Sequence, residues 1–178
     1  MNLIALHGAP GVGKLTVARE LQALTSYRLF HNHLAMELGF ALFPPQSMAF
    51  RELRERIWLD ALGTAANEGL GGVIFTLVFE PTLLPGFYER LVSTVEVSGG
   101  SVHPFELRCS PEENARRVVQ PDRRAFSKES NPEFLLSARE AGAYDPPAIS
   151  ENTIIDTTHL TAAETAQRIL EALNATMR

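Results

Sequence analysis

Residues 8–14 read Gly8-Ala9-Pro10-Gly11-Val12-Gly13-Lys14 and fit the G-x-x-x-x-G-K pattern of a phosphate-binding loop, the P-loop. The glycines let the backbone curl until successive N–H groups point at phosphate oxygens. The positive N-terminal end of the following helix adds to that attraction. The Lys14 ammonium can follow the β- and γ-phosphates while phosphate is transferred. The segment predicts an ATP-binding site in which residues 8–13 contribute their backbone and Lys14 its charge.

The sequence around this loop alternates short apolar runs with helical patterns. A run over residues 2–7 precedes the loop, and a helical pattern follows it to about Leu24. Four further runs, at 28–30, 72–79, 102–108 and 152–156, are separated by helical patterns. Strands that alternate with helices favour a parallel sheet with helices on both faces. We therefore predict one α/β domain over residues 1–178, built on a five-stranded parallel sheet.

Several of the predicted helices have clear start signals. Ser47 is a candidate N-cap for a long helix that ends near residue 69. Two other helices open with capping boxes, Ser110 with Glu113 and Thr161 with Glu164. The Asn-Pro pair at 131–132 is expected to begin another helix.

The composition limits the classes of partner. The 178-residue chain has 16 basic and 21 acidic residues, a formal net charge of −5. Nucleic-acid backbones favour surplus positive charge, so we expect no nucleic-acid partner. Cys109 is the one cysteine, which excludes an intrachain disulfide and indicates an intracellular protein. No apolar run approaches the roughly 18 residues of a membrane helix, and no signal peptide is evident. We expect a cytoplasmic monomer or homodimer without a membrane partner.

The position after Lys14 departs from the usual motif, which has Ser or Thr there to hold Mg²⁺. Here that position is Leu15, and Thr16 follows. The run GAPGVGKLTVA, residues 8–18, resembles the P-loop of adenylate kinases and related small-molecule kinases. This resemblance implies that Leu15 and Thr16 belong to the ATP site, with Thr16 facing the phosphates near the metal. It also implies that Mg²⁺ is held mainly by water and nucleotide oxygens.

A group of polar residues follows the second and third predicted strands. His31-Asn32-His33 lies at the carboxyl edge of the sheet, where ligands of such folds bind. A neutral histidine can accept a proton from a hydroxyl; alternatively, the two histidines cap strand and helix ends. Glu80 directly follows the central strand and should lie close to the phosphates. His33 and Glu80 are therefore candidates to orient a phosphoryl acceptor, in a helical region over about residues 32–69.

Three arginines lie on the long helix of that region: Arg51, Arg54 and Arg56. Arginine binds anionic groups through its planar fork. Most of the three are expected to be surface partners of Glu52 and Glu55. The alternative is that one of them contacts an anionic acceptor.

Residues 108–128 are basic within an acidic chain. This segment has six basic residues, Arg108, Arg116, Arg117, Arg123, Arg124 and Lys128, against three acidic ones, Glu112, Glu113 and Asp122. Mobile arginines can stabilise the charge that develops during phosphoryl transfer. The alternatives are a solvated loop and a patch for an acidic partner.

The whole chain resembles the shikimate-kinase-like and nucleotide-kinase-like branch of P-loop kinases. Leu29–His33 also resembles bacterial sequences called shikimate-kinase-like or AAA-family ATPases, and Ile154–Thr161 resembles the segment that surrounds the base. The resemblance implies a three-layer P-loop NTPase fold, a short lid over about 116–142, and contact of Thr158 with the adenine. It also implies that Arg116 or Arg117 packs on the adenine and that Arg123 or Arg124 reaches the phosphates.

The expected activity is transfer of the γ-phosphate of ATP, with Mg²⁺, to a hydroxyl of a small molecule. Residues 76–81 read TLVFEP, so the Asp-Gly-Phe-Pro-Arg motif of adenylate kinases is absent. The aspartates that shikimate kinases place after the second strand are replaced by histidines and an amide. A nucleoside monophosphate kinase and a nucleotide-binding regulator with little turnover are the alternatives.

Overall fold

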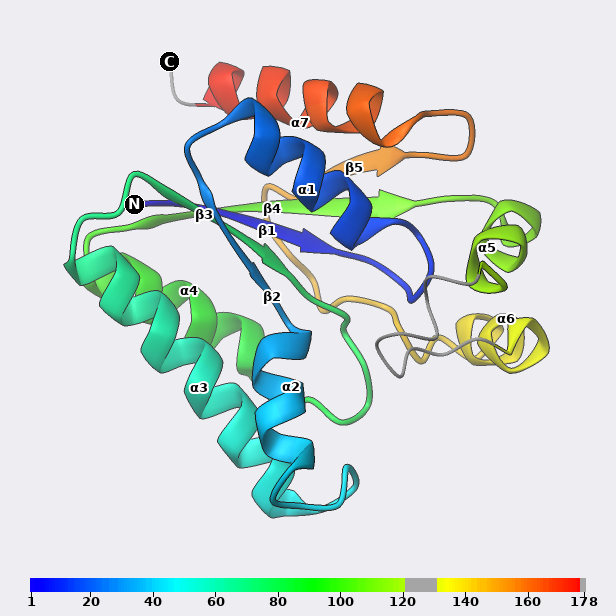
Figure 1. The fold of residues 1–178 in the computed structure, drawn as a ribbon, viewed down its shortest axis with the longest axis horizontal. Helices are drawn as coiled ribbons and strands as arrows, with labels where there is room; N and C mark the ends of the chain where they lie inside the picture. Colours follow the sequence, from blue (N-terminus) through cyan, green and yellow to red (C-terminus); the bar gives the residue numbers. More distant parts are fainter. Residues whose placement is uncertain (121–130, 177–178) are drawn as a thin grey trace.

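The computed structural model describes residues 1–120 and 131–176 of the chain. Their central feature is a parallel sheet with the strand order β2-β3-β1-β4-β5 (Figure 1). The strands are β1 (Asn2–His7), β2 (Arg28–His31), β3 (Gly72–Thr76), β4 (Ser101–Arg108) and β5 (Thr153–Asp156). The predicted five-stranded parallel sheet is confirmed.

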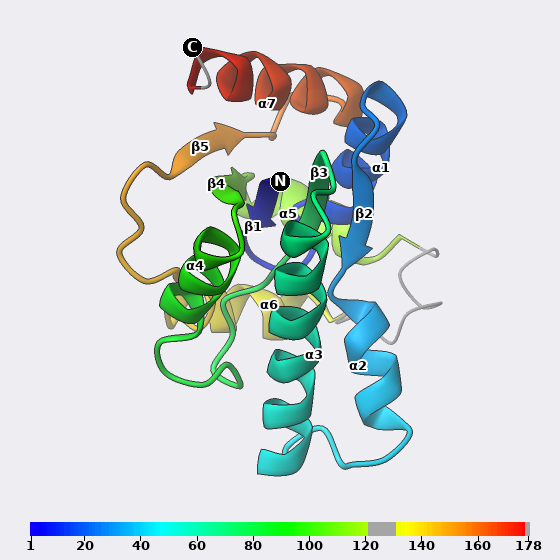
Figure 2. The same cartoon turned by 90° about the vertical axis from the view of Figure 1, so that its left-hand side faces the viewer.

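Helices cover both faces of this sheet (Figures 1 and 2). One face carries α1 (Lys14–Leu24) and α7 (Ala162–Thr176), and the other carries α3 (Met48–Asn67) and α4 (Phe87–Val97). The helix α2 (His33–Phe40) follows β2 and packs against α3. Beyond the carboxyl ends of the strands lie α5 (Pro111–Val118) and α6 (Pro132–Glu140). This is the three-layer P-loop NTPase arrangement.

The strands divide the interior into two cores, because successive side chains of a strand point to opposite faces. Ile4, Leu6 and Ile74 join the core beneath α1 and α7. Leu3 and Phe75 join the core beneath α3 and α4. The central strands therefore need apolar residues on both faces, which explains their continuous apolar runs.

The third strand is shorter than the predicted range of 72–79. Its last residue, Thr76, pairs with His31 of β2 and with Leu6 of β1. Both neighbouring strands end there or one residue later, and one more backbone hydrogen bond, from Leu77 N to the Leu6 oxygen at 2.8 Å, extends the pairing. Residues 78–81 have no adjacent strand to pair with, so they leave the sheet at its carboxyl edge.

The predicted helix starts are confirmed by their side-chain caps. The Ser47 hydroxyl accepts a hydrogen bond from Phe50 N, and Ser110 accepts one from Glu113 N, each at 3.2 Å. At the start of α7, Thr161 Oγ1 accepts a 3.2 Å hydrogen bond from Glu164 N. Across residues 1–120 and 131–176, no helix is both long enough and apolar enough to cross a membrane.

Candidate functional site

The loop between β1 and α1 has the shape of a phosphate cradle. Gly8, Gly11 and Gly13 have φ of +131°, +89° and +102°, values that L side chains rarely adopt. A Cβ on Gly8 would lie 2.3 Å from the Leu107 oxygen, and one on Gly11 would lie 2.5 Å from Asn114 Nδ2. Conformation therefore favours glycine at all three positions, and close packing adds to this at Gly8 and Gly11.

We expect Gly8→Ala to lower the free energy of unfolding by about 3 kcal/mol, because backbone strain and a clash with β4 act together. Gly69→Ala is the matched control: Gly69 has φ +69° and no atom within 4 Å of an added Cβ. In Gly69→Ala, backbone strain alone should therefore lower the free energy of unfolding by about 1 kcal/mol. Urea unfolding of both variants measures the difference, and equal losses would contradict the packing argument.

Lys14 begins α1 and reaches back over the loop. Its Nζ donates hydrogen bonds to the Gly8 and Ala9 oxygens at 2.7 and 2.9 Å. The loop carbonyls thus hold the ammonium beside the backbone N–H groups that a phosphate would need. The role of Lys14 in binding phosphate stays a prediction.

Two cavities adjoin the loop. The central cavity has a volume of about 530 Å³, and its lining includes most of the predicted site: Pro10, Gly11, Gly13, Lys14, Leu15, Thr16, His33, Glu80 and Arg117. The side cavity, about 500 Å³, is lined in part by Val12, Gly13, Thr16, Arg116, Arg117 and Thr158. Gly8 and Ala9 contribute the carbonyls that hold Lys14. Arg123 and Arg124 lie outside the described residues.

Residues from α2 and from the end of β3 form one wall of the central cavity, here called the α2–β3 wall: Asn32, His33, Met36, Thr76, Val78, Glu80 and Pro81. Thr76 is buried, and its hydroxyl accepts a hydrogen bond from Asn32 N at 3.3 Å. His31 lies behind His33, with 6.2 Å between ring centroids, and is not part of the lining. Of the two predicted histidines, His33 is therefore the one placed at the cavity.

A buried arginine holds Glu80 in this wall. Arg54 Nη1 donates to Glu80 Oε1 at 2.8 Å and to Thr82 Oγ1 at 3.1 Å, while Nη2 donates to the Thr82 oxygen at 3.0 Å. The Arg54 side chain is 1% exposed and stacks near Phe50 and Trp58. Burial lowers the pKa of Arg54, and the adjacent Glu80 opposes that shift. An arginine remains charged in proteins, so Arg54 places a buried positive charge directly beside Glu80.

The neighbouring charges of α3 differ from the surface pairs expected. Glu55 is also buried; it accepts hydrogen bonds from Leu84 N at 2.7 Å and from Arg90 Nη2 at 2.6 Å. Arg56 is exposed, and Arg51 is partly buried. None of the three predicted arginines lines the central cavity. Arg54 and Glu55 instead anchor the segment between β3 and α4.

Arg117 stands between the two cavities. Its guanidinium donates to the Val12 oxygen at 2.9 Å, to Thr157 Oγ1 at 2.9 Å and to the Thr157 oxygen at 2.7 Å. Ion pairs with Arg116 and Arg117 lower the pKa of Glu113 to about 2. Arg117 therefore joins the phosphate loop to the segment that follows β5. That segment, with Thr158, lines the side cavity.

A second link between the P-loop and α5 was not evident from the sequence. Asn114 is fully buried in α5; its Nδ2 donates to the Pro10 oxygen at 3.0 Å, and its Oδ1 accepts from Arg139 Nη1 at 2.7 Å. Arg139 of α6 also donates to the Cys109 oxygen at 3.2 Å. Asn114 thus bonds α5 directly to the P-loop, and Arg139 connects α6 to that contact through Asn114. An Asn at the fourth position of a polar helix was the available sequence signal.

The described residues provide few direct ligands for Mg²⁺. They contain no group of three or more His, Cys, Asp or Glu side chains that could hold a metal ion. Thr16 lines both cavities beside the loop. Mg²⁺ commonly keeps several waters and binds through substrate phosphates. The donor set therefore fits a metal that arrives with the nucleotide, with the Thr16 hydroxyl beside it.

Directly before the loop, His7 belongs to a buried polar chain. His7 Nε2 and Asn152 Oδ1 are 2.9 Å apart, and Asn152 Nδ2 donates to Glu106 Oε2 at 2.9 Å. Glu106 is paired with Arg108 at 2.5 Å. The His7 Nδ1 atom is buried and has no hydrogen-bond partner among the described residues. Burial therefore lowers the pKa of His7 below its usual 6.5, although Asn152 and Glu106 oppose the shift.

The stability of the protein should consequently fall below about pH 6.5, the usual pKa of histidine. In that range the unfolded chain takes up a proton at residue 7 that the folded chain resists, so the stability present above pH 6.5 is lost on acidification. We expect wild type to lose up to about 1.4 kcal/mol per pH unit relative to His7→Gln. Urea unfolding of both proteins at pH 7.5 and 5.5 tests this, and parallel pH profiles would contradict it.

The sheet order and the glycine loop with its lysine define a P-loop NTPase domain. The chain belongs to the AAA domain family, whose model matches residues 4–133. None of the curated proteins matches the sequence.

Solved structures show the same fold. The tunicamycin resistance protein of Deinococcus radiodurans is 22% identical, with a TM-score of 0.64, and the match covers 98% of this chain and 96% of that one. A gluconokinase of Sinorhizobium meliloti is 18% identical, with a TM-score of 0.67, covering 98% and 93%. Shikimate kinase of Acinetobacter baumannii, in complex with shikimate, is 22% identical, with a TM-score of 0.62, covering 98% and 93%. The predicted resemblance to such kinases is confirmed for the fold.

Proposed function

We propose that this protein is an ATP-dependent phosphotransferase that moves the γ-phosphate of Mg·ATP to a hydroxyl of a small molecule. The observation that carries the proposal is the lining of the central cavity, which brings P-loop residues and Lys14 together with His33 and Glu80. Both halves of a phosphoryl transfer can therefore meet in one cavity. Two of the structurally similar proteins are kinases by name, a gluconokinase and a shikimate kinase, which supports the proposal.

In the proposed reaction, the loop N–H groups and Lys14 bind the β- and γ-phosphates, while the adenine occupies the side cavity near Arg117 and Thr158. The acceptor oxygen forms a bond to the γ-phosphorus, and the bond to the β–γ bridging oxygen breaks, which releases ADP. The hydroxyl proton passes to Glu80 or His33. Mg²⁺ bound beside Thr16 supplies charge neutralisation at the phosphates. A lid arginine, Arg123 or Arg124, stabilises the transferring group.

The test is ADP release from Mg·ATP in the presence of three acceptor pools. The first pool contains nucleoside monophosphates, and the second contains nucleosides with aminoglycoside-like and phenolic antibiotics. The third contains polyol acids, including shikimate. The proposal predicts that one pool raises turnover well above the background hydrolysis of ATP. If ATP binds and no pool changes the rate, the function reduces to nucleotide binding.

A further inference from the structure

The charge of the α2–β3 wall limits the acceptor. Among its seven residues, Glu80 is the one carboxylate, and no lysine or arginine is present. The nearest buried cation, Arg54, already donates to Glu80 and Thr82 and is 1% exposed, so its guanidinium is not presented to the cavity. Lys14 and Arg117 line the same cavity from α1 and α5. An acceptor seated on the α2–β3 wall therefore meets a carboxylate that is already paired with Arg54, and this wall offers no cation to an anionic group.

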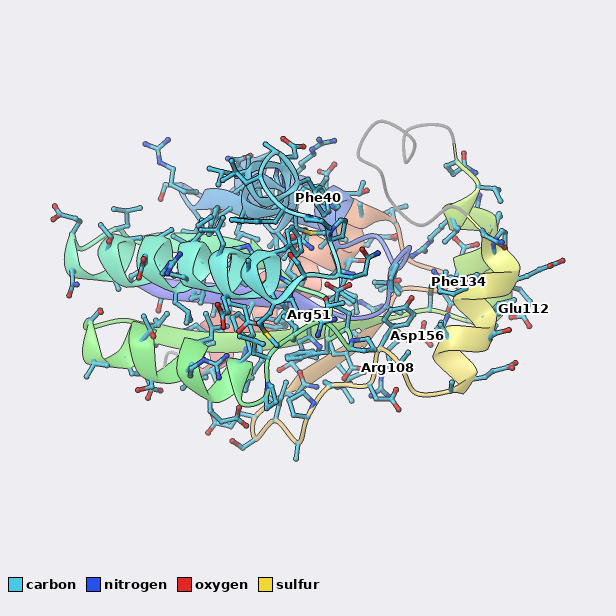
Figure 3. All side chains as sticks on the ribbon, turned by 90° about the horizontal axis from the view of Figure 1, so that it is seen from below. Phe40, Arg51, Arg108, Glu112, Phe134 and Asp156 are labelled. Atoms are coloured by element: carbon cyan, nitrogen blue, oxygen red, sulfur yellow. The ribbon has the colours of Figure 1, made fainter. Side chains whose placement is uncertain are left out.

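Apolar side chains also line the central cavity. Met36 and Val78 lie on the wall, and Phe134 and Tyr144 line the cavity from α6 and the segment after it. Phe134 is 56% exposed, so its ring is accessible to a ligand in the cavity. Figures 1 and 3 place α6, which carries Phe134, beyond the strand ends and away from α3. Apolar groups thus face the acceptor from two separate elements.

We infer that the acceptor is a non-anionic hydroxyl compound, an alcohol or phenol with an apolar face and without a carboxylate or phosphate. This inference rests on the proposed function and specifies its substrate class. Glu80 orients the hydroxyl, while Met36, Val78 and Phe134 contact the apolar face. An anionic group on this wall would lose water without gaining a cation, because Arg54 is already bonded to Glu80 and Thr82, so the wall disfavours anionic acceptors.

The experiment compares uncharged acceptors with related anions: methyl shikimate with shikimate, glucose with gluconate, and adenosine with its monophosphate. A panel of phenols and uncharged glycosides is assayed beside them. ADP formation is followed at pH 8, where an ordinary imidazole is neutral. We expect the most active acceptors to be uncharged or cationic. We also expect kcat/KM for the uncharged member of the best pair to exceed that for the anion by about tenfold or more.

Two variants connect this preference to the wall. Glu80→Gln removes the negative charge and should reduce the ratio of kcat/KM for the uncharged and anionic members, even though it slows both reactions. Glu37→Gln is the matched control, since Glu37 is an exposed carboxylate of α2 outside the cavity lining. A loss of activity through structural damage alone would leave the ratio unchanged.

The outcomes separate the two proposals. Phosphorylation of anionic acceptors alone would overturn the inference and leave the phosphotransferase in place. Stimulation by no acceptor, with Mg·ATP still bound, would overturn the phosphotransferase, and the acceptor class would fall with it.

Discussion

Lys14→Ala is expected to lower kcat for acceptor-dependent ADP formation by about 10²- to 10³-fold, the loss typical of removing one preorganised charge-stabilising donor. Lys14 Nζ lies against the Gly8 and Ala9 oxygens, at the mouth of the phosphate cradle. Its charge is needed most where negative charge develops during transfer. The effect should therefore be larger on kcat than on the KM for ATP. Steady-state kinetics with varied ATP measures both constants.

The matched control is Arg19→Ala. Arg19 is exposed on the same helix, α1, and lies outside the lining of both cavities. Arg19→Ala removes the same formal charge from the same helix as Lys14→Ala. A general electrostatic effect would therefore change the activity of both variants equally. A Lys14→Ala protein that retained more than half of the wild-type turnover would exclude Lys14 from the reaction.

Arg54→Ala is expected to lower the free energy of unfolding by about 3 kcal/mol, within the range for breaking a buried ion pair. The variant loses three hydrogen bonds to Glu80 and Thr82 and the ring contacts with Phe50 and Trp58. For a chain of this size the loss corresponds to a fall in Tm of about 10 °C. Glu80 is 31% exposed and can regain water, which keeps the estimate at the lower end of that range.

Arg56→Ala provides the control, because Arg56 is exposed on the same helix and its loss should change stability by about 0.5 kcal/mol or less. Urea unfolding gives the stabilities, and a double-mutant cycle with Glu80→Gln gives the coupling between residues 54 and 80. Activity measured well below Tm should also fall for Arg54→Ala, because Glu80 loses its orientation. A coupling near zero would show that the Arg54–Glu80 contact does not hold the carboxylate.

The parts of the fold predicted correctly depend on local signals. The P-loop, the alternation of strands and helices, and the caps at Ser47, Ser110 and Thr161 are each contained in a few consecutive residues. The third strand was predicted three residues too long, because its end depends on where two other strands stop. Apolar residues at 77–79 continue the pattern and so conceal that boundary.

The sequence by itself determined the phosphate-binding half of the site, because residues 8–14 contain the three glycines, the lysine and the start of the next helix. Tertiary structure alone decided the other half. Arg54 pairs with a residue 26 positions away, and Arg117 with the loop 105 positions away. Whether an arginine is a surface charge, a substrate contact or a buried support depends on which distant groups pack around it. Because Arg54 is buried behind Glu80 and does not line the cavity, Glu80 is the charged side chain that the α2–β3 wall presents.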